Sequence, residues 1–382
     1  MPRLTIVADE NIPQVKQRFS TLGDVITVNG RNLCPQQLQH ADILLVRSVT
    51  RVNKSLLAGT PVRFVATATI GIDHLDIDYL EANKIGWASA PGCNANSVVD
   101  YIISAICRLD GLLELLLADG TVGIIGMGSV GGRLYQRLSD LEIQCTAYDP
   151  LIDQNSYPIL GDLETVLAAD VICLHTPLTT TGSHPSLHLL NEDNLARINS
   201  GAVIINAGRG AVIDNNALKQ TLVERDDICT VLDVWEGEPE LDIELLKRVD
   251  LATPHIAGYS HDGKLIGLEM IYQACCCFFS LEPESLEVRP ADDNLTIVLS
   301  EQSDRIAAMR EAVLSCYDVA QDDQRFRGSL LRCQQQQRGE EFDRLRKHYP
   351  ERRELSRYRI VNVDELDNAV ITGLSALGFI CC

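Results

Sequence analysis

Residues 121–149, with the sequence TVGIIGMGSVGGRLYQRLSDLEIQCTAYD, decide the fold. The apolar run 121–125 predicts a buried parallel strand, and it enters a G-x-G-x-x-G loop at Gly126. Apolar residues at helical spacing follow the loop, and a second apolar run at 145–148 ends in Asp149. A strand, a glycine loop, a helix and a second strand in this order predict one βαβ unit of a parallel sheet.

Each position of the glycine loop has a physical reason. Gly126 permits a tight turn between strand and helix, and Gly128 lets the backbone approach a pyrophosphate. Gly131 lets the helix pack closely on the strand. Ser129 and Val130 open the helix, whose free N–H groups attract phosphate charge. The loop therefore predicts a dinucleotide-binding site.

Asp149 specifies which dinucleotide is expected. It lies 18 residues after Gly131 (149 − 131), at the end of the second predicted strand. A carboxylate at that place accepts hydrogen bonds from the ribose hydroxyls and repels a 2′-phosphate, so NAD is preferred over NADP. A glycine-rich turn alone can be merely a turn, but the acid in register with two strands and a helix favours the cofactor site.

Composition narrows the class of protein. The 382 residues predict two or three domains, and 46% hydrophobic with 23% charged residues is ordinary for a soluble protein. A formal charge of −20 argues against nucleic acid or an anionic membrane as a partner. Acidic residues as early as Asp9 argue against a signal peptide, so a cytoplasmic protein is expected. The 13 cysteines include no C-x-x-C pair, so we expect free thiols and no metal.

The remaining chain is predicted to form an α/β protein with three parts. Residues 1–95, together with about 259–282, alternate strand-like and helix-like segments, which predicts a flavodoxin-like α/β substrate domain. Residues 96–258 are predicted to form a Rossmann domain, a doubly wound parallel sheet that binds NAD. The composition changes at about 283, and residues 283–382 are expected to form a small C-terminal α/β module.

Three polar residues follow predicted strands of the Rossmann domain: Arg209, Glu238 and His255. Removing a hydride from an alcohol carbon needs a base for the hydroxyl proton, and histidine titrates near neutral pH. A carboxylate such as Glu238 can fix the imidazole tautomer, and Arg209 can hold a substrate carboxylate by two parallel hydrogen bonds. Each of these residues alone could have a structural role, but three of them that follow strands of one sheet favour a catalytic site.

These residues lie in motifs that resemble a known family. NAGRGAVID (206–214), DVWEGEP (233–239) and PHIAG (254–258) are similar to the three signatures of the D-isomer-specific 2-hydroxyacid dehydrogenases. The resemblance implies that Arg209 binds the substrate carboxylate, that Glu238 supports His255, and that His255 is the proton donor or acceptor.

Other motifs resemble one branch of that family. RSVT (47–50), TAT (67–69), PGCNA (91–95), HIAGY (255–259) and RLRKHYPERRE (344–354) are similar to members that act on a phosphorylated 2-hydroxy acid. The resemblance implies a homodimer formed through the C-terminal module. It also implies that the substrate is contacted by Ser48, Thr69 and Tyr259. The residues implied to contact NAD are Asp149, Thr176, Asp233 and Gly258.

The substrate phosphate needs cationic partners, and cations are scarce in this acidic chain. We therefore hypothesise that Arg47, Arg51, and Arg352 or Arg353 from a partner subunit bind it. Two alternatives stay open at this point. One is the same chemistry on another acid, such as 3-phosphoglycerate. The other is a non-catalytic protein that senses NAD and controls assembly.

Overall fold

The chain forms two compact units in the computed structural model, which describes residues 3–284, 295–300 and 304–381. The first unit comprises Met1–Asn94 and Ser260–Asp293, and the second comprises Ala95–Tyr259 and Asn294–Cys382. The expected division into three domains stays a prediction. The change of composition expected at about 283 is followed by residues 285–294, which lie outside the described residues.

The first unit is built on a five-stranded parallel sheet with the order β2-β1-β3-β4-β5. This is the flavodoxin-like order, so the predicted fold of this part is confirmed. Its strands are β1 Leu4–Asp9, β2 Gly23–Val28, β3 Ile43–Val46, β4 Phe64–Thr67 and β5 Gly86–Ala88. Its helices are α1 Val15–Phe19, α2 Lys54–Leu57, α3 Ile77–Ala82 and α11 His261–Phe279.

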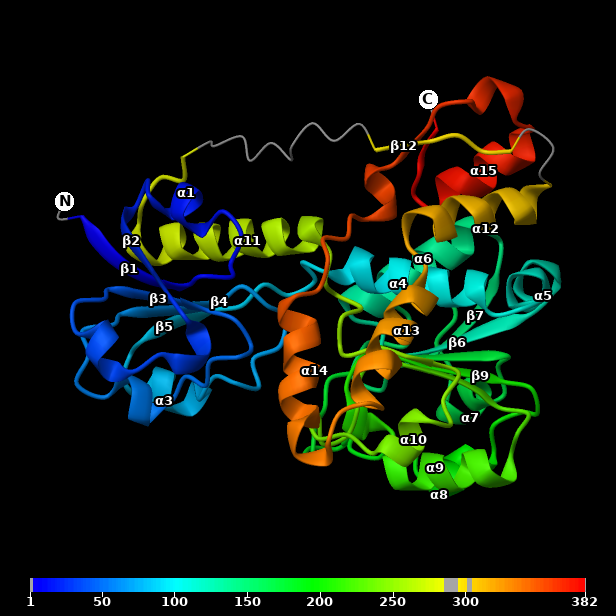
Figure 1. Cartoon of the computed structure of the whole chain (residues 1–382), viewed down its shortest axis with the longest axis horizontal. Helices are drawn as coiled ribbons and strands as arrows, with labels where there is room; N and C mark the ends of the chain where they lie inside the picture. The colour runs from blue at the N-terminus through cyan, green and yellow to red at the C-terminus, as the bar shows by residue number, and fades with distance from the viewer. Residues whose placement is uncertain (1–2, 285–294, 301–303, 382) are drawn as a thin grey trace. The chain divides into compact units, whose positions relative to one another are not determined.

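Helices cover both faces of this sheet, with α11 on one side and α3 on the other (Figure 1). Helix α11 begins where the Ser260 hydroxyl accepts a hydrogen bond from Gly263 N at 2.8 Å. Leu268 and Ile271 of α11 are fully buried against strand residues such as Ile6. Burial of an aliphatic side chain contributes about 1.5–3 kcal/mol, so this face holds α11 on the sheet.

The second unit contains a six-stranded parallel sheet with the order β11-β10-β9-β8-β6-β7. Its strands are β6 Thr121–Ile125, β7 Gln144–Tyr148, β8 Val171–Leu174, β9 Val203–Asn206, β10 Cys229–Leu232 and β11 Leu251–Ala252. Beyond β7, a single parallel bridge joins Ala147 to Leu160. The short segment between Asp149 and Asp170 therefore supplies one bridging residue where a doubly wound sheet has a further strand. The predicted Rossmann sheet is confirmed.

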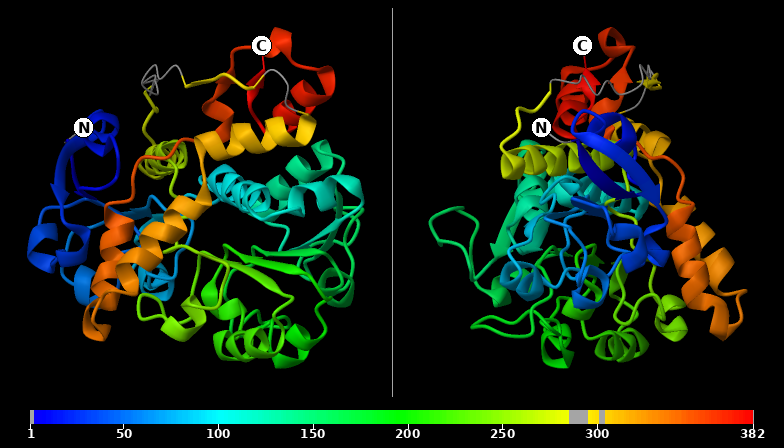
Figure 2. Two further views of the ribbon diagram at one scale, coloured as in Figure 1. Left: turned by 45° about the vertical axis from the view of Figure 1, so that its right-hand side comes forward. Right: turned by 90° about the vertical axis from the view of Figure 1, so that its left-hand side faces the viewer.

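Helices also cover both faces of the second sheet (Figure 2). The helices of this part are α4 Ala95–Arg108, α5 Leu112–Ala118, α6 Ser129–Asp140, α7 Leu163–Leu167, α8 Glu192–Ala196, α9 Asn215–Glu224 and α10 Ile243–Leu246. Helix α4 carries Val98, Val99 and Ile102 at helical spacing, and these residues are buried. They form one core with Val122 and Ile124 of β6.

The C-terminal residues add a three-stranded parallel sheet, β12-β13-β14, and four helices. The elements are β12 Thr296–Ile297, β13 Arg359–Ile360, β14 Ile380–Cys381, α12 Arg305–Cys316, α13 Val319–Leu330, α14 Arg338–Lys347 and α15 Asn368–Ala376. Helix α13 covers the edge strand β11, where Ala252 N donates to Asp323 Oδ1 at 2.8 Å. Arg327 of α13 also donates to Val249 O at 2.6 Å. Covering an edge strand satisfies backbone groups that would otherwise stay unpaired.

Between β2 and β3 the chain forms two short 3₁₀ helices, Gly30–Asn32 and Pro35–Leu38. The cysteines of the described residues are free thiols, as expected; Cys275 and Cys276 are buried in α11 and Cys277 is exposed. Among the helices of the described ranges, none has the length and apolar character to cross a membrane.

Candidate active site

The glycine loop after β6 has the geometry that a dinucleotide requires. Gly126 has φ +92°, and a Cβ there would lie 2.9 Å from Thr176 N. A Cβ at Gly131 would lie 2.0 Å from Gly126 O, so only glycine lets α6 pack this closely. A Cβ at Gly128 would meet nothing within 4 Å, and it would fill the side from which a pyrophosphate approaches. The loop therefore fits the cofactor.

The N-terminus of α6 offers backbone N–H groups beside the glycine loop. Gly128 is the N-cap residue and makes no side-chain cap hydrogen bond, so Ser129 and Val130 begin the helix with N–H groups available to an anion. Asp149 lies beside them at the end of β7. Its carboxylate accepts from Met127 N at 2.9 Å and from Leu151 N at 3.1 Å, which orients it next to the glycine loop.

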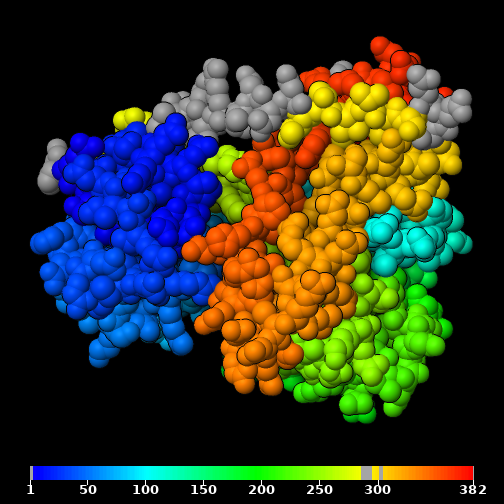
Figure 3. Space-filling model, viewed as in Figure 1, coloured from blue at the N-terminus to red at the C-terminus, as the bar shows by residue number. Residues whose placement is uncertain are grey.

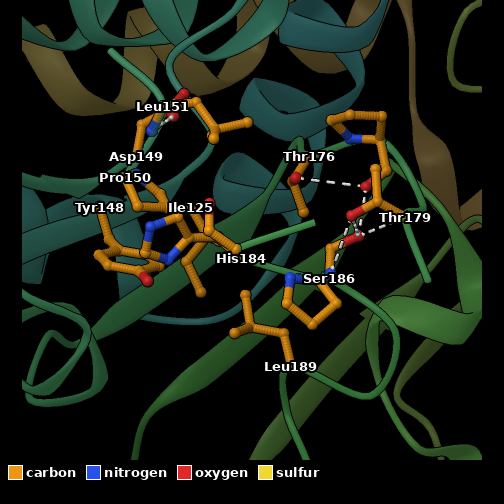
Figure 4. A pocket seen from close by; sticks show the side chains of 14 residues that line it. Ile125, Tyr148, Asp149, Pro150, Leu151, Thr176, Thr179, His184, Ser186 and Leu189 are labelled. Carbon is orange, nitrogen blue, oxygen red and sulfur yellow. Dashed lines mark hydrogen bonds between the residues drawn. The ribbon is translucent and has the colours of Figure 1, made fainter. Parts of the chain in front are cut away.

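A pocket of about 250 Å³ opens at this edge of the second unit (Figure 4). Its wall includes Gly126, Tyr148, Asp149 and Thr176, four residues at the carboxyl ends of neighbouring strands. Ligands bind at that end of open α/β sheets. The position and lining of the pocket therefore suit part of a dinucleotide, and the contact of Asp149 with its ribose stays a prediction.

The far wall of the pocket is a loop that the sequence did not single out. Thr179, His184 and Ser186 of this loop line the pocket. Thr179 N donates to Ser186 Oγ at 2.8 Å, and Ser186 N donates to Thr179 Oγ1 at 3.0 Å, so the loop is braced across its base. Its signal was its position directly after β8, since loops after parallel strands carry ligand contacts.

The loop with Arg209 follows β9 and is shaped by Asn206. Asn206 Oδ1 accepts from Gly208 N at 3.1 Å, and its Nδ2 donates to Arg209 O at 3.0 Å. A Cβ on Gly210 would lie 2.0 Å from the carbonyl carbon of Trp235. Glycine is therefore required because the Arg209 loop lies directly on the backbone that leads to Glu238.

Glu238 and His255 form a hydrogen-bonded pair. His255 Nδ1 lies against Glu238 Oε1, and Glu238 Oε2 accepts from Trp235 N at 3.1 Å. Burial by itself would raise the pKa of Glu238, but the neighbouring His255 and Arg346 lower it below its usual value. Glu238 is therefore a carboxylate, and with the proton of the neutral imidazole on Nδ1 the other nitrogen, Nε2, is a base.

The backbone at His255 is held in an uncommon conformation by Asp233. His255 has φ +56°, which is unfavourable by about 1–2 kcal/mol for a residue with a side chain. His255 N donates to Asp233 O at 2.7 Å, and the buried Asp233 carboxylate accepts from Ile256 N at 2.7 Å and Ala257 N at 2.9 Å. These bonds fix the turn that presents the imidazole.

The predicted cofactor contacts at Asp233 and Gly258 stay predictions. The Asp233 carboxylate also accepts a hydrogen bond from Thr253 Oγ1 at 2.6 Å. Its hydrogen bonds therefore stabilise the segment 253–259 that carries His255, which we call the histidine loop. Gly258 continues this loop and is half-buried. Tyr259 ends it, with its ring 5.9 Å from the ring of Tyr349.

The other two expected substrate residues lie in the first unit. Ser48 follows β3 and Thr69 follows β4, and these neighbouring parallel strands are paired through Val46 and Thr67. Both residues therefore lie at the same sheet edge. Thr69 Oγ1 shares a hydrogen bond of 2.7 Å with Thr67 Oγ1.

The arginines proposed to bind the substrate phosphate differ in their exposure and in their contacts. Arg47 Nε lies 3.3 Å from Asp9 Oδ2, and Arg51 is exposed. Arg352 is only 7% exposed, and its guanidinium donates to Ser97 and Ala257 of its own chain. Nη2 of Arg352 is thus occupied by hydroxyl and carbonyl groups of its own chain, whereas Nη1 is buried without a hydrogen-bond partner among the described residues. Its role at a partner's substrate stays a prediction. Arg353 is equally buried.

One group of side chains within the described ranges has the spacing of a metal site. Ligand atoms of His188, Asp214 and Glu236 all lie within 4.8 Å of one another. Asp214 caps α9 by accepting from Ala217 N at 3.0 Å, and Glu236 accepts from His188 Nε2 at 2.8 Å when that nitrogen carries the proton. These acceptors already have donors, so the cluster is explained without a metal.

Comparison with known protein families agrees with this geometry. The model described as "D-isomer specific 2-hydroxyacid dehydrogenase, NAD binding domain" matches residues 108–257. A second model, described as a domain of unknown function, matches residues 290–378. NAD is therefore the cofactor of the second unit, in agreement with the shape of its glycine loop.

Curated relatives cover nearly the whole chain. The erythronate-4-phosphate dehydrogenase of Cellvibrio japonicus is 48% identical over 99% of this chain and 100% of its own length. That of Pseudomonas putida (strain F1) is 46% identical over 92% of this chain and 93% of its own. The fold resembles that of the NAD⁺-bound 3-phosphoglycerate dehydrogenase of Entamoeba histolytica, with a TM-score of 0.62, 22% identity, and coverage of 75% and 99% of the two chains. The chain belongs to the erythronate-4-phosphate dehydrogenase family, a branch of the D-isomer-specific 2-hydroxyacid dehydrogenases.

Proposed function

We propose that this protein oxidises 4-phospho-D-erythronate at C2, with NAD as the acceptor, to (R)-3-hydroxy-2-oxo-4-phosphooxybutanoate. This is a step of pyridoxal 5′-phosphate biosynthesis. The observation that carries the proposal is the Glu238–His255 pair, which follows strands of the same sheet that forms the NAD pocket. The names of relatives at 43–48% identity support the choice of substrate.

The proton goes to His255. Nε2 accepts the proton of the C2 hydroxyl while the C2–H bond breaks, and Glu238 on Nδ1 stabilises the imidazolium that forms. NAD, when bound, accepts the hydride from C2. In the reverse direction the imidazolium returns its proton to the carbonyl oxygen of the 2-oxo acid.

Arg209 is proposed to orient the substrate. Its guanidinium can hold the C1 carboxylate by two parallel hydrogen bonds, which places the adjacent C2 at the reacting position. The cation also stabilises negative charge that develops on the oxygen at C2 during reduction. Ser48, Thr69 and Tyr259 are proposed to contact the remaining substrate hydroxyl and phosphate groups.

Turnover of two phosphorylated acids tests the proposal. We expect NADH formation from 4-phosphoerythronate to exceed that from 3-phosphoglycerate by at least about tenfold in kcat/KM, since the relatives are named for the former. Preference for 3-phosphoglycerate would keep the mechanism and overturn the substrate. Turnover of neither acid, with NAD still bound, would overturn the enzymatic reading and favour an NAD sensor.

We also infer that the protein works as a homodimer. The support is the family's C-terminal module, which is present here as α12–α15 and three short strands. Sedimentation velocity across a dilution series measures this directly, and a monomer at all concentrations would contradict it. The cytoplasmic location stays a prediction from the sequence.

A further inference from the structure

The C-terminal helices pack directly on the loop that carries Glu238. Figure 3 shows α13 and α14 (orange) against the light-green surface of this region. A Cβ on Gly339 of α14 would lie 2.1 Å from Glu240 Oε1, so the helix begins in close contact with this loop. The ring of Phe326 of α13 lies 6.0 Å from that of Trp235 and 5.8 Å from that of Phe342 of α14. Helices α13 and α14 therefore support the loop that carries Glu238.

Arg346 is the cation that this packing brings to the site. Its side chain is 17% exposed, and its guanidinium carbon lies 5.7 Å from the centre of the Tyr259 ring and 5.8 Å from that of Phe342. Nη1 is 4.0 Å from Asp343 Oδ1, and Nε is buried without a hydrogen-bond partner among the described residues. A charge this poorly exposed needs nearby anions or dipoles to be stable.

The electrostatics show which groups stabilise it. Burial alone would lower the pKa of Arg346, but Tyr259, Glu238 and Asp343 raise it above its usual value. In return Arg346 helps His255 to lower the pKa of Glu238. The cations that stabilise the Glu238 carboxylate are therefore His255, which is hydrogen-bonded to it, and Arg346 of α14, which acts through its charge.

We propose that Arg346 is a positioning residue for the dehydrogenase reaction. Its guanidinium packs beside the Tyr259 ring and adds a positive charge near Glu238, so that the C-terminal module completes the catalytic site of its own chain. The inference rests on the proposed function, because it assigns Arg346 a role through the Glu238–His255 pair. It gives the module a catalytic task besides any part in assembly.

The sign of the effect follows from charge. Without the Arg346 cation, the negative charge of Glu238 acts on the imidazole unopposed and favours its protonated form. Oxidation of the substrate needs the neutral imidazole as base, so the acidic limb of its pH–rate profile moves to higher pH. Reduction of the 2-oxo acid needs the imidazolium, so the basic limb of that pH–rate profile moves to higher pH as well. For a partly screened charge a few ångströms away, we expect a shift of about 0.5–1 pH unit.

The test compares Arg346→Met with Arg344→Met. Arg344 lies on the same helix, is 55% exposed and pairs with Glu341 at 2.6 Å, so its loss controls for a changed helix. We expect Arg346→Met to move both pH limbs upward and to raise the KM for 4-phosphoerythronate about threefold to tenfold, with NADH binding unchanged. Arg344→Met is expected to behave as the unmodified enzyme.

Two further variants keep the test decisive. Arg346→Lys retains the charge and should keep both limbs of the pH–rate profile in place, while its KM for 4-phosphoerythronate rises less than that of Arg346→Met, because lysine keeps the charge but cannot reproduce the planar guanidinium. Arg346→Gln should shift the limbs even if the methionine variant fails to fold. If the limbs of the pH–rate profiles coincide for Arg346→Gln and the unmodified enzyme, the inference is overturned. An unmodified enzyme without turnover would instead overturn the proposed function.

Discussion

The glycine loop of the cofactor pocket and the catalytic residues are built from the chain in different ways. The glycine loop and Asp149 come from one βαβ unit, residues 121–149, and are joined by the hydrogen bond from Met127 N to Asp149. Glu238 and His255 come from the loops after β10 and β11, whereas Arg346 comes from α14, 91 residues after His255 (346 − 255). A local site depends on the conformation of one short stretch, whereas a composite site depends on every element that holds it. The two should therefore respond differently to substitution.

The largest expected effect is at the composite site. His255→Ala removes the base and should lower kcat by about 10²–10⁴-fold, because general base catalysis contributes that much. NAD binding should stay within about twofold, since the pocket lies on other strands. Steady-state kinetics together with quenching of protein fluorescence by NADH would measure both. A kcat reduced less than tenfold would assign the proton to another group.

Gly210→Ala tests whether contact between the loops matters. The added Cβ would lie 2.0 Å from the backbone of Trp235, so the loops bearing Arg209 and Glu238 must separate. We expect kcat/KM to fall by about 10²-fold and unfolding free energy to fall by about 1–3 kcal/mol. The matched control is Gly328→Ala, where nothing lies within 4 Å of the Cβ. Equal effects of the two changes would contradict the account of the loop contact.

Asp149→Ser tests the local site alone. Loss of the charge-assisted hydrogen bonds to ribose should raise the KM for NAD about 10–100-fold and narrow the preference for NAD over NADP. The kcat at saturating NAD should stay within about threefold because the catalytic pair is untouched. Kinetics with both cofactors measure the ratio. An unchanged NAD/NADP preference would remove Asp149 from cofactor selection.

The smallest effect concerns stability at the junction of β8 and the pocket. Burial lowers the pKa of His175 to about 3, and both its ring nitrogens lack partners among the described residues, although part of the side chain is accessible. Since the folded pKa is depressed below the unfolded value of 6.5, stability is full above pH 6.5 and is lost as pH falls toward 3. Because part of the side chain is accessible, we expect the free energy of unfolding at pH 5 to be lower by about 1–2 kcal/mol.

His175→Leu should remove that loss. Urea unfolding at pH 7 and pH 5 measures it, with His40→Leu at an exposed position as the control. The difference between the two pH values should shrink in His175→Leu and persist in His40→Leu. A difference that persists in both variants would show that the loss of stability at pH 5 does not come from His175.

The same contrast explains what the sequence could predict. The roles of Gly126 and Gly131 followed from spacing within 121–149, and the φ of Gly126 and the contact of Gly131 agree with them. Strand patterns were equally local, so the sheets were predicted, although the third Rossmann strand shrank to the Ala147–Leu160 bridge. Local periodicity contains this information directly.

Residues that act across the fold could not be predicted in this way. Arg346 lies 108 positions after Glu238 (346 − 238) and becomes relevant only because α14 packs on the loop at Pro239–Glu240. Arg352 was considered as a ligand of a partner's substrate because cations are scarce, and the fold buries it beside Ser97, which the sequence did not predict. Nothing in the spacing of either arginine distinguishes a site residue from a structural one.

The central claim is that a hydride leaves C2 of 4-phosphoerythronate for NAD while His255 takes the hydroxyl proton. Incubation of the enzyme with C2-deuterated 4-phosphoerythronate and NAD, followed by mass spectrometry of the NADH, tests it most directly. The account predicts NADH carrying one deuterium, formed at least about 10²-fold more slowly by His255→Ala. Unlabelled NADH, or equal rates for the two proteins, would contradict it.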